Sequence, residues 1–137
     1  MAVIKELIRS EADSTISFGD YTLKEKSKLQ DFEHEGDLYK VKTYNEITKL
    51  ERNGMFVYES VPGTAVNHMK VTETGVQFNV EGTEDAQITV ELAEDTEYKI
   101  FIDDTNVGKM KTNLGGKLAL SVELNKDSQS KVKIVKL

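Results

Sequence analysis

Apolar and polar residues alternate along the second half of the chain, in short runs separated by Gly, Asn, Asp and Thr. The clearest run contains Val76, Phe78 and Val80, and residues 88–92 and 118–124 repeat its alternation. Successive side chains of a strand point to opposite faces of the sheet. These runs therefore predict half-buried strands, each with one apolar face and one solvated face.

Three further segments are rich in β-branched or aromatic residues, which favour strands. They are residues 98–102, 107–112 and 132–137, and the polar stretch 103–106 offers a tight connection between the first two. Turn residues recur at intervals of about 8–12 residues, which is typical of antiparallel all-β domains. The expected fold is therefore an all-β, antiparallel β-sandwich of immunoglobulin-like or jelly-roll type.

The pattern is less regular near the N-terminus. Apolar residues at helical spacing between residues 3 and 9 predict a short amphipathic helix. Residues 15–23 predict a pair of strands bent at Gly19 and Asp20. The highly charged stretch 24–36 is expected to form a loop or a short helix.

A hairpin is the clearest local prediction. Residues 37–43 and 46–52 have strand character, and the second of these segments leads into Asn53-Gly54. This dipeptide favours the tight turns that join antiparallel strands, and residues 55–59 continue as the returning strand.

The only proline, Pro62, marks the break between the irregular front part and the regular second part. We expect an N-terminal segment, residues 1–61, that contains the short helix and hairpins and is packed on its own chain or swapped between subunits. Residues 62–137 are expected to supply the sandwich strands.

Composition narrows the possible functions. The chain has 137 residues, the size of one domain, and a net charge of -6 that repels nucleic acid and anionic membranes. Only Arg9 and Arg52 are arginines, which argues against sites built on arginine clusters. There is no cysteine, so disulfides and thiolate chemistry are excluded. The charged N-terminus and the absence of a long apolar run predict a cytoplasmic protein.

Gly115-Gly116-Lys117 invites comparison with a phosphate-binding loop, which requires a glycine five residues before the second glycine and Ser or Thr after the lysine. Lys111 and Leu118 occupy those positions, and a strand pattern follows instead of a helix. The glycines are therefore expected to form a turn between strands.

His34 and His68 are the candidates for acid–base chemistry, and neither lies at metal-ligand spacing from the other. We expect surface histidines without a catalytic role, no metal site and no cofactor. Acidic pairs beside turns could hold calcium but lack the spacing of a calcium-binding loop. These pairs are Glu84-Asp85, Glu94-Asp95 and Asp103-Asp104.

Aromatic residues crowd the segment 32–58, where five of the ten lie within 27 residues. They are Phe32, Tyr39, Tyr44, Phe56 and Tyr58. Placed on adjacent strands, Tyr39 and Tyr58 could stack on a sugar or form an apolar surface for a partner. The alternative is that these rings close the core beneath the front segment.

Parts of the chain resemble known bacterial proteins. Residues 97–108, 112–124 and 131–137 look like the closing strands of β-sandwich accessory modules appended to polysaccharide-degrading enzymes. The whole chain, notably 56–64 (FVYESVPGT) and 109–116 (KMKTNLGG), resembles short proteins of clostridia (Firmicutes) commonly labelled endosialidase. This resemblance implies cleavage of sialic-acid polymers.

Taken together, the residues favour a non-catalytic protein that works through its surface, as a self-assembling or partner-binding module. We expect a homo-oligomer or a protein partner, with the predicted helix crossing to a neighbouring subunit. The alternative is a carbohydrate-binding module that uses Tyr39, Tyr44 and Tyr58. A glycan-active enzyme that uses His34 or His68 with nearby carboxylates is a further alternative.

Overall fold

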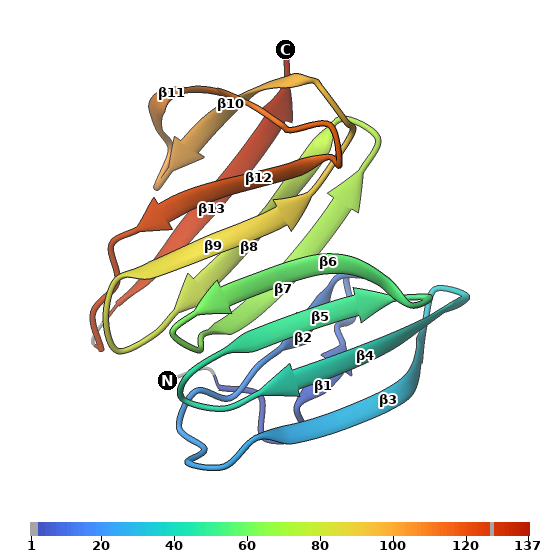
Figure 1. Ribbon diagram of the computed structural model, residues 1–137. Helices are drawn as coiled ribbons and strands as arrows, with labels where there is room; N and C mark the ends of the chain where they lie inside the picture. The colour runs from blue at the N-terminus through green and yellow to red at the C-terminus, as the bar shows by residue number, and fades with distance from the viewer. Residues whose placement is uncertain (1–2, 127) are drawn as a thin grey trace.

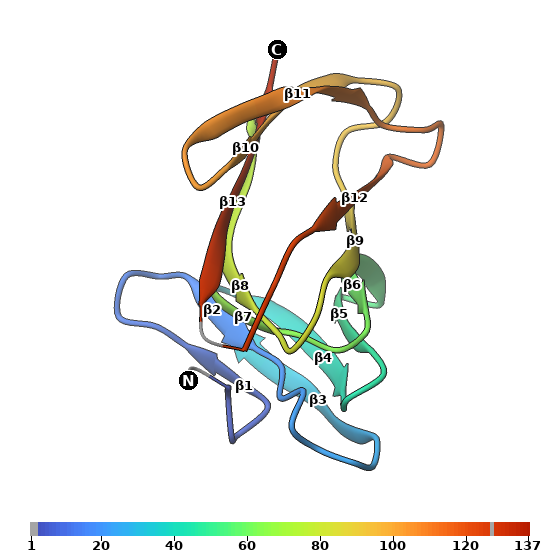
Figure 2. The same ribbon diagram turned by 90° about the vertical axis from the view of Figure 1, so that its left-hand side faces the viewer.

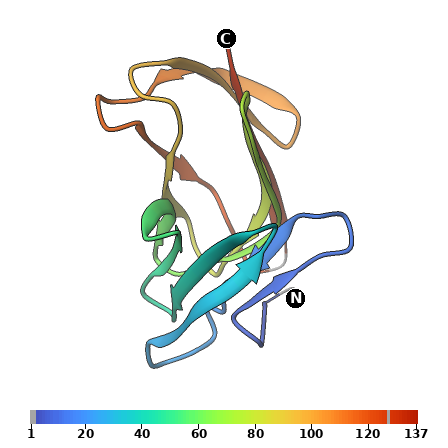
Figure 3. The ribbon, with the colours of Figure 1, turned by 90° about the vertical axis from the view of Figure 1, so that its right-hand side faces the viewer.

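The computed structural model describes residues 3–126 and 128–137, which form two antiparallel β-sheets and no helix (Figure 1). The predicted all-β sandwich is therefore confirmed. The turned views show the sheets as two layers, with β8 and β13 in one and β9 and β12 in the other (Figures 2 and 3).

The larger sheet has seven strands in the order β1-β2-β7-β8-β13-β10-β11. In this order its strands are Ile8–Ser10, Ile16–Phe18, Ala65–Thr72, Gly75–Glu81, Gln129–Lys136, Glu97–Ile102 and Thr105–Lys111. The smaller sheet has six strands in the order β12-β9-β6-β5-β4-β3. These are Lys117–Val122, Ala86–Glu91, Met55–Val61, Thr48–Arg52, Asp37–Thr43 and Ser27–His34.

Both sheets contain strands from either side of residue 61. In the smaller sheet, β6 pairs with β5 on one edge and with β9 on the other. In the larger sheet, β7 lies between β2 and β8. The front part and the second part of the chain therefore contribute to the same two layers.

The core between the sheets is built around Tyr58, which has no exposed surface. Its ring makes edge-to-face contacts with Phe18 and Phe78, at centroid distances of 5.3 and 5.6 Å. Its hydroxyl lies 2.8 Å from the Thr64 hydroxyl, so the polar end of the ring is satisfied inside the core. One aromatic residue of the smaller sheet thus packs against two rings of the larger sheet.

The prediction of a short N-terminal helix between residues 3 and 9 is wrong. The chain turns after Ile4, with the Leu7 amide donating to the Ile4 carbonyl, and β1 begins at Ile8. Leu7 has a φ of 73°, which no α-helix allows. Seven residues are too few for a stable isolated helix, and Ile4 and Ile8 gain more by packing into their own chain, where both are buried. The described residues of this segment therefore do not form a helix that crosses to a neighbour.

The charged stretch 24–36 contains a strand, β3, and not a short helix. A β-bulge separates Leu29 from Phe32 in its pairing with β4. The bulge inserts an extra residue between the two inward-facing side chains, which removes the simple alternation from the sequence. In residues 15–23 only Ile16–Phe18 forms a strand, because Gly19 then turns with a φ of 100°.

Several turn predictions are confirmed. Asn53 and Gly54 join β5 to β6 as a hairpin. The glycine segment forms a turn after β11 that carries the chain into β12 of the other sheet. Gly116 has a φ of 81°, and a Cβ there would lie 2.4 Å from the Leu92 carbonyl oxygen, so only glycine fits this position without strain.

Candidate functional site

Six connections gather at one end of the sandwich, which we call the hairpin end (right side of Figure 1). Loops at the ends of a sandwich can vary without disturbing the core, which is why binding surfaces are often found there. The connections are residues 11–15, 35–36, 53–54, 73–74, 92–96 and 112–116.

A groove opens between the two sheets at the hairpin end. It consists of two hollows of 270 and 300 Å³, which share Arg52, Val57, Met69 and Val71 as walls. The first hollow is also lined by Met55, Phe56, Leu92 and Tyr98, and the second by His34, Asp37 and Tyr39. A wall that combines apolar side chains with charged groups is found at many ligand and partner sites.

Large apolar side chains are exposed around this groove. Met55 is 64% exposed and Val71 is 43% exposed, and both also line the groove. Leu38, Leu114 and Leu137 are exposed at the same end. Met110, opposite Tyr98 near the end of β11, is also exposed toward this end. The remaining large exposed apolar residues of the described chain, Val61 and Val107, lie outside the hairpin end. No pattern in the sequence indicates this grouping, because its members come from separate strands and become neighbours only in the fold.

The five predicted aromatic residues do not form one surface. Tyr58 lies in the core and cannot stack on a ligand. Tyr39 and Tyr58 are not on adjacent strands, because β5 lies between β4 and β6. Tyr39 is 9% exposed, lines the second hollow and contacts the His34 ring edge-to-face at 5.9 Å. The alternative that these rings close the core therefore holds for Tyr58 and Tyr39, which both belong to the buried core.

The other three aromatic rings are half-buried and face different surroundings. Phe32 packs against the rim of the core. The Lys117 ammonium lies 4.7 Å from the centre of the Phe56 ring, and the Lys26 ammonium lies 5.9 Å from that of Tyr44. These are cation–π distances, so lysine side chains already contact Phe56 and Tyr44.

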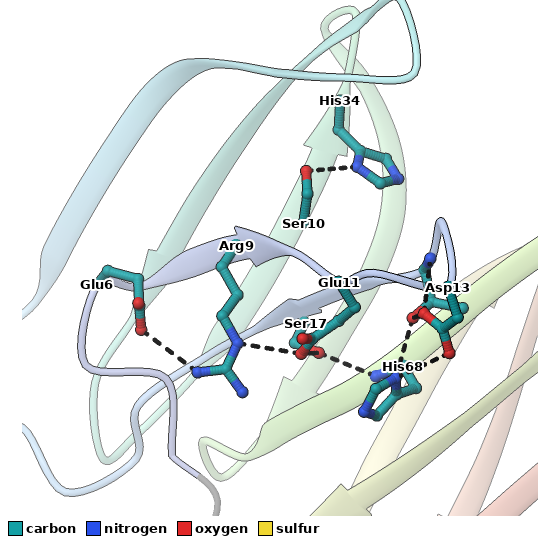
Figure 4. Close-up of polar contacts among 9 residues, drawn as sticks. Glu6, Arg9, Ser10, Glu11, Asp13, Ser17, His34 and His68 are labelled. Carbon is teal, nitrogen blue, oxygen red and sulfur yellow. Dashed lines mark hydrogen bonds and ion pairs between the residues drawn. The ribbon is translucent and has the colours of Figure 1, made fainter.

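His34 is buried and makes hydrogen bonds through both ring nitrogens. Nε2 lies 3.2 Å from the Ser14 carbonyl oxygen, and Nδ1 lies 2.7 Å from the Ser10 hydroxyl (Figure 4). A carbonyl only accepts, so Nε2 carries the proton, and in a neutral ring Nδ1 accepts the Ser10 proton. The arrangement pairs a hydroxyl with a base, as nucleophilic catalysis requires. It also joins three segments at the wall of the groove.

His68 belongs to a separate polar network on the same side. Its Nδ1 lies 3.2 Å from the Asp13 carboxylate and 3.1 Å from the Thr15 hydroxyl. Its backbone amide donates to the Ser17 hydroxyl at 3.0 Å, within a β-bulge where His68 has a φ of 55°. These bonds attach the β1–β2 hairpin to β7. His34 and His68 therefore have different partners and do not form a joint site.

The same network continues to Arg9. The Ser17 hydroxyl donates to the Glu11 carboxylate, and the Arg9 guanidinium donates to it at 3.0 Å (Figure 4). The hydrogen bond from Ser17 lowers the pKa of Glu11, with a smaller contribution from Arg9. Likewise, hydrogen bonds from Thr15 lower the pKa of Asp13. Both carboxylates are held in the charged form near neutral pH.

The acidic pairs considered for calcium contact other parts of the chain. Asp85 accepts the Leu124 amide at 3.0 Å, and Asp95 forms an ion pair with Lys111 at 3.2 Å. Asp103 accepts the Lys131 amide at 2.8 Å. Over residues 3–126 and 128–137, no group of three His, Asp or Glu side chains is placed to hold a metal ion.

Comparison with known proteins returned no match to any family model, curated protein or solved structure. In the described part of the chain, no helix has the length and apolar character needed to span a membrane. The candidate site therefore rests on its own geometry. That geometry is a groove lined by apolar and charged side chains, a rim of exposed apolar side chains, and histidine networks that support one wall.

Proposed function

We propose that the protein is a non-catalytic binding module that associates with a second copy of itself through the hairpin end. The observation that carries the proposal is the concentration of exposed apolar side chains around the groove. Exposed apolar patches on a folded domain are costly unless a partner covers them. The immunoglobulin-like or jelly-roll type of the sandwich stays a prediction that accompanies this proposal.

Charge supports a second copy as the partner. Arg52 and Lys70 line the same hollow as Glu35 and Asp37, while Glu73 and Glu91 line the other hollow, where Glu91 also pairs with Lys117 at 3.3 Å. A surface with both signs can pair with itself across a twofold axis, because each positive group then meets a negative group of the other copy. Met55 and Val71 would form the apolar centre of such a contact.

Native mass spectrometry and light scattering across a concentration series test this proposal. We expect a dimer, and Met55→Lys or Val71→Lys should weaken it about tenfold or more, as is typical of central interface residues. Val107→Lys is the matched control, because Val107 is 58% exposed on β11 and lies outside the hairpin end. A monomer at all concentrations, or equal weakening by Val107→Lys, would refute the proposal.

The alternative is a carbohydrate-binding module. The three-tyrosine stacking surface is not available, since Tyr58 is fully buried, but Tyr44 is half-buried at the end of β4 and Tyr39 lines the groove. A glycan array with wild type and Tyr44→Ala separates this alternative from self-association. Absence of binding to every glycan on the array would refute the carbohydrate-binding alternative.

The resemblance to proteins labelled endosialidase suggests a glycan-active enzyme as a second alternative. Arg9 is already engaged by Glu6 and Glu11, and Arg52 is the single arginine in the groove. The paired Ser10 and His34 are the groups to test. We expect no turnover of a fluorogenic sialoside, and turnover that is lost in His34→Gln would establish the enzyme.

A further inference from the structure

Five lysines crowd the outer face of the smaller sheet, in a protein whose net charge is -6. This lysine patch comes from β3, β4, β5 and the segment before β3. Its members are Lys26, Lys28, Lys40, Lys42 and Lys49. The patch lies on a sheet face and not at the hairpin end, so it is independent of the contact proposed above.

Three of the lysines form one row across neighbouring strands. Lys28 of β3 is directly opposite Lys42 of β4, and Lys42 is directly opposite Lys49 of β5. Val41 and Leu50, which precede Lys42 and follow Lys49, are fully buried, so all three lysines point to the solvent side. Directly opposite like charges destabilise a sheet. The row therefore costs stability in the free protein.

The surroundings neutralise this charge only in part. Lys49 forms an ion pair with Glu51 at 3.8 Å, and Lys40 is directly opposite Glu51. Glu59 is opposite Lys49 on the next strand. Burial lowers the pKa of the Lys42 ammonium, and the positive charges of the four surrounding lysines lower it further. Lys42, at the centre of the row, is thus the residue that would gain most from an added anion.

We propose that the lysine patch binds an acidic polysaccharide, with Lys28, Lys42 and Lys49 contacting successive carboxylate or sulfate groups. Neighbouring strands are about 4.8 Å apart, which is comparable to the length of one sugar unit in an extended chain. Lysines are mobile point charges with rotatable donors, which suits anionic groups at variable positions along a flexible polymer. A groove is not required, since the sheet face can lie along the chain.

The surroundings of the nearest aromatic rings favour a polysaccharide over nucleic acid. Single-stranded nucleic acid gains much of its affinity from bases stacked on open aromatic faces. The rings nearest the patch, Tyr44 and Phe56, are contacted by Lys26 and Lys49, respectively, at centroid distances of 5.9 Å.

Fluorescence anisotropy with labelled oligosaccharides tests the proposal on the intact protein. The probes are a sulfated heparin fragment and an oligogalacturonate, which separate sulfate from carboxylate recognition, with neutral dextran and a single-stranded oligonucleotide for comparison. We expect binding of at least one acidic oligosaccharide and of neither comparison probe. Raising the salt concentration should weaken it, because charge pairing releases counterions.

Lys42→Gln gives the sharpest test because its two expected effects have opposite signs. It should weaken acidic-oligosaccharide binding about tenfold, as loss of a charge-assisted hydrogen bond does. The free protein should be as stable as wild type or more stable, because like-charge repulsion is removed. Lys133→Gln is the matched control, since Lys133 on the larger sheet lies opposite Gln77 and Phe101 and not opposite another lysine.

The following results would overturn the proposal: no binding of either acidic probe, equal loss with Lys133→Gln, or oligonucleotide binding as tight as the best oligosaccharide. Met55→Lys provides the link to the earlier proposal. It should weaken self-association and leave acidic-oligosaccharide binding unchanged, so that failure of one proposal is visible separately from failure of the other.

Discussion

The Ser10 hydroxyl lies 2.7 Å from Nδ1 of His34, and this hydrogen bond joins the edge strands of the two sheets. Ser10 ends β1 of the larger sheet, whereas His34 ends β3 of the smaller sheet. The bond therefore fastens the two layers at the edge beside the groove. It gives the Ser–His pair a structural role.

Ser10→Ala should lower the free energy of unfolding by about 1 kcal/mol, the net value of a typical hydrogen bond. Chemical denaturation measures the change. Ser121→Ala is the control, because its exposed hydroxyl makes only a long contact of 3.4 Å with Gln87. Equal stability of Ser10→Ala and wild type would show that the bond does not fasten the edge.

Tyr58→Phe should cost about 1 kcal/mol, because it removes only the hydroxyl that bonds Thr64. Tyr58→Ala should cost about 3–5 kcal/mol, because it leaves a cavity between Phe18 and Phe78. Urea denaturation distinguishes the two variants. A Tyr58→Ala protein with near-native stability would mean that the ring is not the centre of the core.

The Glu11 network predicts loss of stability in acid. The folded-state pKa of Glu11 is lowered, so its contribution is complete above the unfolded value of about 4.3 and is lost as pH falls through the folded-state pKa. Ser17→Ala removes the main cause of this lowering. Its stability should therefore fall less steeply between about pH 5 and pH 3 than that of wild type.

Thermal denaturation across this pH range checks the prediction. Glu123→Gln serves as the control, because Glu123 is exposed, directly follows β12 and lies outside the Glu11 network. Wild type and Ser17→Ala with parallel pH profiles would contradict the assigned role of the Ser17–Glu11 bond.

Comparing alanine variants of Gly116 and Gly36 distinguishes the cost of backbone strain from the cost of a steric clash. Their φ values are nearly equal, 81° and 82°. A Cβ added at Gly116 would lie 2.4 Å from the Leu92 carbonyl oxygen, whereas a Cβ added at Gly36 would have no atom within 4 Å. Gly36→Ala should cost about 1–2 kcal/mol from the left-handed conformation alone. Gly116→Ala should cost clearly more by the same denaturation measurement, and equal costs would contradict the close approach.

The local sequence pattern was sufficient to predict an element where neighbouring residues alone determine the backbone conformation. Asn53-Gly54 predicted its hairpin, and the alternation at 76–80 and 118–124 predicted strands with the correct inward faces. The pattern gave a wrong prediction where contacts with other segments determine the backbone conformation. Residues 3–9 have helical spacing, yet Ile8 pairs with Phe18 and is buried by tertiary packing, and the bulge in β3 hid its alternation.

The candidate surfaces depended on register in the same way. Lys28, Lys42 and Lys49 lie on three consecutive strands, and their alignment follows from the register in which β3, β4 and β5 pair. Met55 and Val71 are brought together by the meeting of two hairpins from different sheets. No composition or spacing rule contains either arrangement.

By itself, the sequence determined that this is an antiparallel all-β protein without thiol chemistry and with too few arginines for arginine-cluster sites, because alternation and residue counts are local properties of the chain. The tertiary structure decided which side chains became core and which remained surface. It placed Tyr58 in the core, joined two edge strands through the Ser10–His34 hydrogen bond and left the lysines facing solvent. The physical reason is that burial and charge proximity are set by strand pairing between segments that the linear pattern does not connect.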